Sequence, residues 1–173
     1  MLNTCTFGKN QRMDLYPAIL HNEINDTCNW IYDNINNGVY QCGFSTTQSA
    51  YNAACEKVSY GLTKCNTILS KQNYLCSDTQ FTEADLYLLP TILRYDGVYS
   101  PFFKAGGVHN RIATSYPAIY DWLKRCWDIN DGCIRDTIDV EDAQLSYYKQ
   151  LFPLNPGGIV PMGITLKDMG LEE

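Results

Sequence analysis

Residues 81–86 of the chain read Phe-Thr-Glu-Ala-Asp-Leu, and this hexapeptide has the pattern of a helix start. Thr82 is in the N-cap position, and Asp85 lies three residues later, where its carboxylate can accept the backbone N–H of Thr82. Phe81 and Leu86 flank this capping box at the two positions of a hydrophobic staple. The stretch therefore predicts a helix that starts directly after Thr82, with a structural and not a catalytic role for the box.

Four further helices are predicted from apolar residues that recur every three or four positions. They are expected over about Pro17 to Asn36, from Ser45 onward, over Pro117 to Trp127, and over about Val140 to Leu151. A sustained alternation of polar and apolar residues, which would indicate strands, is not found in the sequence. The chain is therefore predicted to be all-α.

Three local signals set the expected details of these helices. Asn37-Gly38 should end the first helix, since glycine readily takes the left-handed conformation that follows a helix. Ser45 and Gln48 have the spacing of a capping box for the second. Pro90 lies inside the helix that starts at Thr82 and predicts a kink near Tyr87.

The segment from Phe152 onward is predicted to be non-helical. It carries three prolines and two adjacent glycines, at positions 153, 156, 157, 158 and 161. Such a segment is expected to run extended over the surface, with Ile159 and Val160 as its anchors.

The composition indicates a folded protein that binds neither nucleic acid nor an anionic membrane as its main partner. Thirteen basic and nineteen acidic residues are interspersed and give a net charge of −6, and 45% of the residues are hydrophobic. No apolar run approaches the roughly 18 residues of a membrane span, and the first fourteen residues lack the apolar region of a signal peptide. We therefore expect a soluble, intracellular protein, with cytoplasm and organelle both open.

Eight cysteines need an explanation, and they stand at positions 5, 28, 42, 55, 65, 76, 126 and 133. They include no Cys-x2-Cys pair, and His21 and His109 are the two histidines, so no zinc site is predicted. A disulfide framework fits small secreted domains better, and most of the cysteines are interpreted as small apolar core residues. Cys42 and Cys76 fall in predicted loops and stay open as reactive thiols, although no cationic neighbour argues for a lowered pKa.

Several motifs then occur in one order along most of the chain from Asp14 to Gly163. They are residues 29–40 (Asn-Trp-Ile-Tyr-Asp-Asn-Ile-Asn-Asn-Gly-Val-Tyr), Gly43-Phe44, Thr47-Gln48-x-Ala50-Tyr51, residues 82–86, Arg94-Tyr95-Asp96-x-Val98-Tyr99, Tyr116-Pro117, Tyr147-Tyr148, and Asn155-Pro156-x-Gly158-Ile159-Val160-Pro161. This ordered set closely resembles the glutathionyl-hydroquinone reductases, which are also called xi-class or omega-like glutathione transferases.

The resemblance implies a helical bundle of the C-terminal glutathione-transferase type. In the family, a thioredoxin-like domain binds glutathione and supplies a cysteine in a Cys-Pro motif, and a helical domain follows it. The chain resembles the helical part alone and contains no Cys-Pro dipeptide. Residues 1–173 are thus expected to form one such domain without the thioredoxin-like domain, with 1–13 as a linker remnant and 152–173 as an extended tail. No cofactor is expected for the chain alone, and glutathione only where a thioredoxin-like domain is present.

The resemblance also implies substrate-binding residues. Tyr40, Tyr147 and Tyr148 would line the hydroquinone pocket, where a phenol can donate to or accept from the quinol oxygen. A purely structural role, as buried rings with satisfied hydroxyls, stays open for all three. Ser146 and Phe102 stand where the family usually has histidine, and both departures favour the structural role. No catalytic residue and no metal site are implied.

Three functions remain open from the sequence. In the first, the chain is a non-catalytic structural or interaction subunit of a larger assembly, a pseudoenzyme. The alternative is the helical substrate-binding half of a glutathione-dependent glutathionyl-hydroquinone reductase, whose cysteine-bearing domain is missing or supplied in trans. The third is a small-molecule binder that holds a planar phenol or a haem-like ligand. A homodimer or a larger complex is expected, with protein covering the face around Val39, Tyr40 and Phe44.

Overall fold

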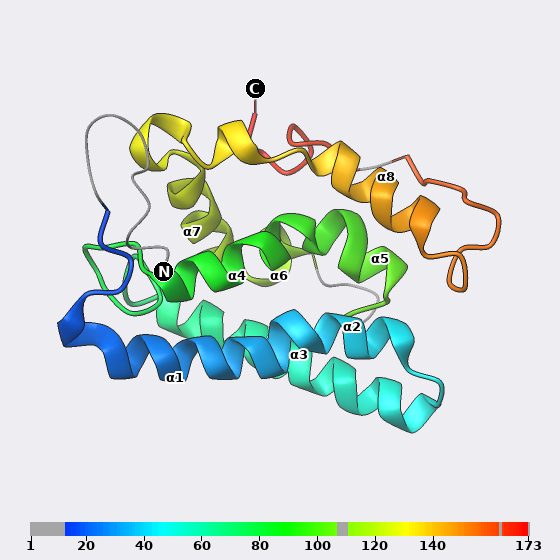
Figure 1. Ribbon diagram of the computed structural model, residues 1–173, viewed down its shortest axis with the longest axis horizontal. Helices are drawn as coiled ribbons and strands as arrows, with labels where there is room; N and C mark the ends of the chain where they lie inside the picture. Colours follow the sequence, from blue (N-terminus) through cyan, green and yellow to red (C-terminus); the bar gives the residue numbers. More distant parts are fainter. Residues whose placement is uncertain (1–12, 107–110, 163, 173) are drawn as a thin grey trace.

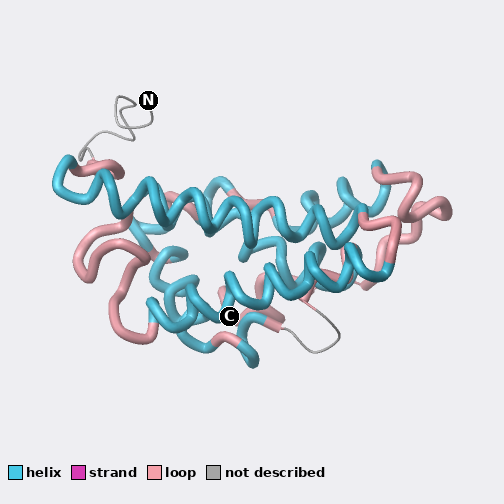
Figure 2. Tube along the Cα trace, turned by 90° about the horizontal axis from the view of Figure 1, so that it is seen from below, coloured by secondary structure: helices cyan, strands magenta, loops and turns pink. Residues whose placement is uncertain are grey.

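Helices form all the regular structure that the computed structural model describes, in residues 13–106, 111–162 and 164–172 (Figure 1). The α-helices are α1 (His21–Ile31), α2 (Asn37–Phe44), α3 (Gln48–Leu69), α4 (Glu83–Arg94), α5 (Ser100–Phe102), α6 (Ile112–Ser115), α7 (Pro117–Trp127) and α8 (Val140–Gln150). The all-α prediction is confirmed, since no strand occurs in these ranges (Figure 2). The first twelve residues of the predicted linker remnant lie outside them.

Two long helical rods form the centre of the bundle. The first rod, residues 21–44, is α1, the π-helix η3 (Tyr32–Asn36) and α2; the second rod, residues 83–102, is α4, the π-helix η4 (Tyr95–Tyr99) and α5. They lie side by side, so that α4 contacts α1 and η3, and η4 contacts α2 (Figure 1). Within the ranges that the structure describes, no helix is long and apolar enough to cross a membrane.

The first rod does not end at Asn37-Gly38, and the predicted helix stop there is wrong. The N–H of Asn37 bonds to the carbonyl of Tyr32, five residues back, and α-helix resumes to Phe44. Gly38 serves close packing: a Cβ on it would lie 2.9 Å from Cγ2 of Val58 on α3. Glycine at position 38 therefore allows close contact between α2 and α3 and does not end a helix.

The N-cap of helix α3 lies two residues after Ser45, the N-cap of the predicted Ser45–Gln48 box. Thr47 has extended backbone angles, and its Oγ1 accepts the N–H of Ala50 at 3.2 Å. The hydroxyl of Ser45 instead donates to the carbonyl of Gln41 at 2.5 Å, at the end of α2. The N-cap is therefore Thr47, and the prediction of Ser45 is wrong.

The second rod starts at Thr82 with both bonds of the capping box. Its α-helix continues through Pro90, and the interruption of α geometry comes at η4 and not near Tyr87. The Tyr87 carbonyl accepts the side-chain amide of Asn36, from the first rod, at 2.9 Å. The neighbouring rod thus supports the helix next to the point where proline removes a backbone donor.

Asp85 lies in the first turn of α4 and is fully buried. Its Oδ2 accepts the N–H and the hydroxyl of Thr82, both at 2.9 Å, and its Oδ1 accepts the Leu75 N–H and the Trp122 Nε1–H, also at 2.9 Å. Burial raises the pKa of Asp85, and the four donors oppose that rise. One carboxylate thus connects α4, α7 and the segment before α4. The staple residues flank it, with Phe81 buried and Leu86 partly buried against the core.

The C-terminal part confirms the helices predicted over Pro117–Trp127 and from Val140, and the tail after α8 is non-helical. Its predicted anchors are only partly right, because the Ile159 side chain is 73% exposed and Val160 is half-buried. The Asn155 amide holds the tail instead, by donating to the carbonyls of Tyr148 and Ile159. Further along, Met169 is buried in the core.

Candidate functional site

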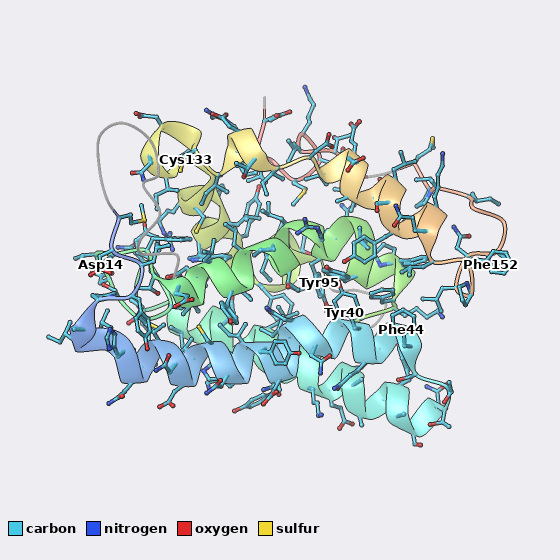
Figure 3. All side chains as sticks on the ribbon, viewed as in Figure 1. Asp14, Tyr40, Phe44, Tyr95, Cys133 and Phe152 are labelled. Carbon is cyan, nitrogen blue, oxygen red and sulfur yellow. The ribbon has the colours of Figure 1, made fainter. Side chains whose placement is uncertain are left out.

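Three tyrosine hydroxyls converge where α2, η4 and α8 meet. Tyr40 and Tyr147, both predicted from the sequence, are hydrogen-bonded at 2.5 Å. Tyr99, which ends η4, joins them at 2.9 Å from the Tyr147 hydroxyl and 3.4 Å from that of Tyr40. Figure 3 shows Tyr40 in the region between α2, α5 and α8. We call Tyr40, Tyr99 and Tyr147 the tyrosine cluster.

Tyr148, the third predicted residue, does not join the cluster. Its ring lies against Phe102, with 4.4 Å between ring centroids, and the residue is 7% exposed. Successive residues on an α-helix point about 100° apart, so Tyr147 and Tyr148 cannot both face α2. Tyr148 is thus part of the packing beside the site.

Phe103 forms the apolar wall of the cluster. Its ring is buried, and its centroid lies 5.4 Å from that of Tyr40, 5.7 Å from that of Tyr99 and 5.9 Å from that of Tyr147. Gly43 makes room for it on α2, since a Cβ there would lie 2.4 Å from Cδ1 of Phe103. The adjacent aromatic pair at positions 102 and 103 is the only local sequence signal for this wall.

The environment keeps the inner hydroxyls neutral. Burial, and then the hydrogen bonds to neighbouring tyrosines, raise the pKa of Tyr99 well above its usual range. Burial also raises the pKa of Tyr147, with the Tyr40 bond as the next cause. Both are therefore protonated at neutral pH and cannot act as phenolate bases. Tyr40 is 37% exposed, so the cluster opens to solvent on its side.

The seven described cysteines are free thiols, and four are buried: Cys42, Cys65, Cys76 and Cys126. Cys42 lies in α2 and not in a loop as predicted. Burial is the first cause that raises the pKa of all four thiols, to about 12 for Cys42 and to about 11 for Cys76. At neutral pH these side chains are apolar residues of the core and not thiolates.

These pKa values predict that stability falls at alkaline pH. The thiols have a reference pKa of 9.0 and ionise less readily in the folded state. Their contribution is therefore complete below pH 9 and is lost as pH rises through about 11 to 12. Each thiol should lower the free energy of unfolding by up to about 1.4 kcal/mol per pH unit in this window. Urea titrations from pH 8 to pH 11 measure it.

The matched control is Cys133→Ser, because Cys133 is exposed and should leave the pH profile unchanged. Cys65→Ala should flatten it. A free energy of unfolding that stays constant up to pH 11 would contradict the burial argument.

Metal ligands do not gather in the described ranges, which contain no group of three or more His, Cys, Asp or Glu side chains placed to share an ion. The His21 ring stacks on that of Tyr16 with 4.0 Å between centroids. His109 lies outside the described residues.

Comparison with known proteins finds similarity to glutathione transferases. Residues 48–125 match the family "Glutathione S-transferase, C-terminal domain". The chain is 36% identical over 150 residues to glutathionyl-hydroquinone reductase YqjG of Escherichia coli, covering 87% of the chain and 44% of that protein. It is 37% identical over 153 residues to glutathione S-transferase omega-like 2 of Schizosaccharomyces pombe, covering 87% and 48%.

Solved structures of glutathione transferases are similar to this chain in fold. Glutathione transferase Xi 1 from Trametes versicolor superimposes with a TM-score of 0.81 at 39% identity, over 87% of this chain and 50% of that one. The glutathione-bound structure of Escherichia coli YqjG gives a TM-score of 0.82 at 35% identity, over 88% and 47%. The chain thus spans about half the length of the relatives it matches.

Proposed function

Since the chain belongs to the xi-class glutathione transferases, the glutathionyl-hydroquinone reductase family, and forms their C-terminal helical domain, we propose that it is the hydroquinone-binding half of such an enzyme. In this proposal the tyrosine cluster holds the phenol, and a thioredoxin-like domain supplies glutathione and the reactive thiol. The domain itself, residues 1–173, is non-catalytic.

The convergence of three hydroxyls from three separate elements carries the proposal. Tyr40, Tyr99 and Tyr147 come from α2, η4 and α8 and meet within 3.4 Å at a partly exposed position. Bulk core packing needs no such meeting of polar groups, because each buried hydroxyl only has to find one partner. Phe103 packs behind the hydroxyls and supports the Tyr40 ring, whose exposed side a planar ligand can reach.

Counting hydrogens indicates which ligand the cluster accepts. Three phenols carry three O–H hydrogens, and the three O–O contacts among them use all three in a closed ring. Each oxygen then has one lone pair left, so the cluster presents acceptors. A hydroquinone, which donates an O–H, fits this arrangement better than a quinone or an ether, which can only accept.

The pKa values of the chain's own thiols support the proposal that the reactive thiol comes from the thioredoxin-like domain. Catalytic turnover of a glutathionyl-hydroquinone at neutral pH needs a stabilised thiolate. Burial, the first cause in each case, instead raises the pKa of Cys28 and Cys42 to about 12 and that of Cys76 to about 11. We therefore expect the chain alone to leave the rate of hydroquinone release from glutathionyl-hydroquinone at the uncatalysed value.

The binding role predicts a preference that calorimetry of the purified chain can measure. Methylhydroquinone should bind at least about fivefold more tightly than its dimethyl ether, since the ether lacks the donor. Tyr147→Phe should remove most of that preference, because it deletes one hydroxyl and opens the ring of hydrogen bonds. Tyr60→Phe is the matched control, as this tyrosine is 60% exposed on α3, outside the cluster.

Two results would contradict the proposal. Equal affinity for the hydroquinone and its ether would mean that the cluster does not receive a donor. An unchanged preference in Tyr147→Phe would mean that the three hydroxyls are a structural network only.

A second function, an interaction subunit of a larger assembly, has its own supporting observation. Large aromatic side chains are exposed along both rods: Tyr32 at 53% and Phe44 at 51% on the first, and Tyr87 at 42% on the second. Such apolar surface favours a protein partner, a second copy or a separate domain. Sedimentation at micromolar concentration tests it, and a monomer that stays soluble would contradict it.

A further inference from the structure

Two cysteines from neighbouring helices meet near Lys104, the residue that follows Phe103. Cys42 lies on α2 and Cys55 on α3, and their Sγ atoms are 3.7 Å apart. A disulfide bond has a length of about 2.0 Å, so the sulfurs need to approach by roughly 1.7 Å. The two helices are consecutive and pack against each other, so side-chain rotation and a small helix shift can cover this distance.

The residues around the pair hold Cys55 close to the loop that follows the second rod. The carbonyl of Lys104 accepts the Tyr51 hydroxyl at 2.8 Å and lies 3.8 Å from Sγ of Cys55. Lys104 follows Phe103 directly and has a left-handed backbone, with φ of 57°. The loop after the second rod is thus fixed to α3 at the cysteine pair.

The two thiols differ in access, which gives them different roles. Cys42 is 3% exposed, whereas Cys55 is half-buried and can be approached from solvent. A reagent therefore reaches Cys55 first, and Cys42 can react only with what is already bonded to Cys55.

We propose that Cys42 and Cys55 form a dithiol–disulfide couple, a modification site that exchanges with low-molecular-weight disulfides such as glutathione disulfide. This site is separate from the hydroquinone-binding role and does not depend on it. It joins α2 to α3 when oxidised and leaves them linked only by packing when reduced.

The exchange balances in two steps. The Cys55 thiolate attacks one sulfur of glutathione disulfide, forms a mixed disulfide and releases one glutathione thiolate. That thiolate takes the proton from the Cys42 thiol, and the Cys42 sulfur then attacks Sγ of Cys55 and releases the second glutathione. Two protein thiols are oxidised, and one disulfide is reduced to two glutathione molecules.

Burial explains why the second step needs the first. It raises the pKa of Cys42 to about 12, and the neighbouring Cys55 is the next cause. Once Cys55 is a mixed disulfide, it can no longer oppose a negative charge on Cys42, and its electrophilic sulfur lies within contact distance. Cys42 should therefore react with its neighbour and not with free reagents.

The experiment treats the full chain with glutathione disulfide and digests it with chymotrypsin, which cleaves after Phe44 and Tyr51 between the two cysteines. Mass spectrometry should find the Cys42 and Cys55 peptides joined and separable only by reductant. The oxidised chain should melt about 5–10 °C higher than the reduced chain, because the bond closes a loop of 14 residues, from Cys42 to Cys55.

Variants separate the two steps. Cys42→Ser should stop at the mixed disulfide, with one glutathione on Cys55 and no rise in melting temperature. Cys55→Ser should leave Cys42 unmodified. Cys133→Ser, at an exposed cysteine away from the pair, is the control and should behave as the unaltered chain. A wild-type chain that keeps glutathione on Cys55, or that links Cys42 to another cysteine, would overturn the proposal.

Discussion

Replacing Asp85 with asparagine is expected to lower the free energy of unfolding by about 3–5 kcal/mol. The side chain is fully buried and accepts four hydrogen bonds, from Leu75, from Thr82 twice and from Trp122. Asparagine keeps the volume but replaces one acceptor oxygen with a donor. At least one pair of donors must then face each other in a place that water cannot reach.

Urea unfolding followed by circular dichroism measures this effect, with Asp142→Asn as the matched control. Asp142 is also an aspartate in the first turn of a helix, but it is exposed on α8. Its replacement should change stability by no more than about 0.5 kcal/mol. Comparable losses at both positions would mean that Asp85 acts only as a helix cap.

A cycle with Trp122→Phe tests the long-range part of the same network. Removing the Nε1 donor should cost less in the Asp85→Asn background than in the unaltered chain, because the two groups share one hydrogen bond. Additive losses would show that this bond does not contribute to stability.

Replacing Gly43 with alanine is expected to destabilise the protein by about 2–3 kcal/mol and to disturb the tyrosine cluster. The new methyl group would lie 2.4 Å from Cδ1 and 2.5 Å from Cγ of Phe103. Phe103 is 1% exposed and packs against Tyr40 and Tyr99, so its ring has no free space to enter. The helix and the ring must therefore separate.

Gly97→Ala is the control for this substitution, since a Cβ there meets no atom within 4 Å. Alanine at this helical position should be neutral or stabilising by up to about 1 kcal/mol. Thermal unfolding reports the stability, and the affinity for methylhydroquinone reports the cluster. If Gly43→Ala kept both, the contact between α2 and Phe103 would not position the site.

The parts of the fold that the sequence predicted are those decided by neighbours in the chain. The Thr82–Asp85 box depends on residues three apart, and Pro117 marks the start of α7 through its own geometry. The hydrogen bond from Trp122 to Asp85 joins residues 37 positions apart, so the spacing of neighbouring residues cannot predict it. The helix stop predicted at Gly38 is wrong for the same reason: Val58, which requires a glycine there, lies twenty positions away.

The candidate site was predicted in part, through resemblance and not through spacing. Tyr40 and Tyr147 were named, but their hydrogen bond joins residues 107 positions apart. Tyr99 was missed although it belongs to a motif that the sequence shares with the family, because nothing local distinguishes it from the other tyrosines. Tyr148 was included because adjacent residues look equivalent in a sequence and point apart on a helix.

The geometry of the tyrosine cluster depends on the number of residues in the two π-helices η3 and η4. One residue added to or removed from a helix turns everything after it by about 100° around the axis. Tyr40 follows η3 and Tyr99 closes η4, so the direction of both hydroxyls is set by the lengths of these segments. Among descendants of a common ancestor, substitutions at exposed positions of these segments, such as Tyr32, can accumulate. A gap of a single residue in either segment should be eliminated by selection wherever the cluster is used.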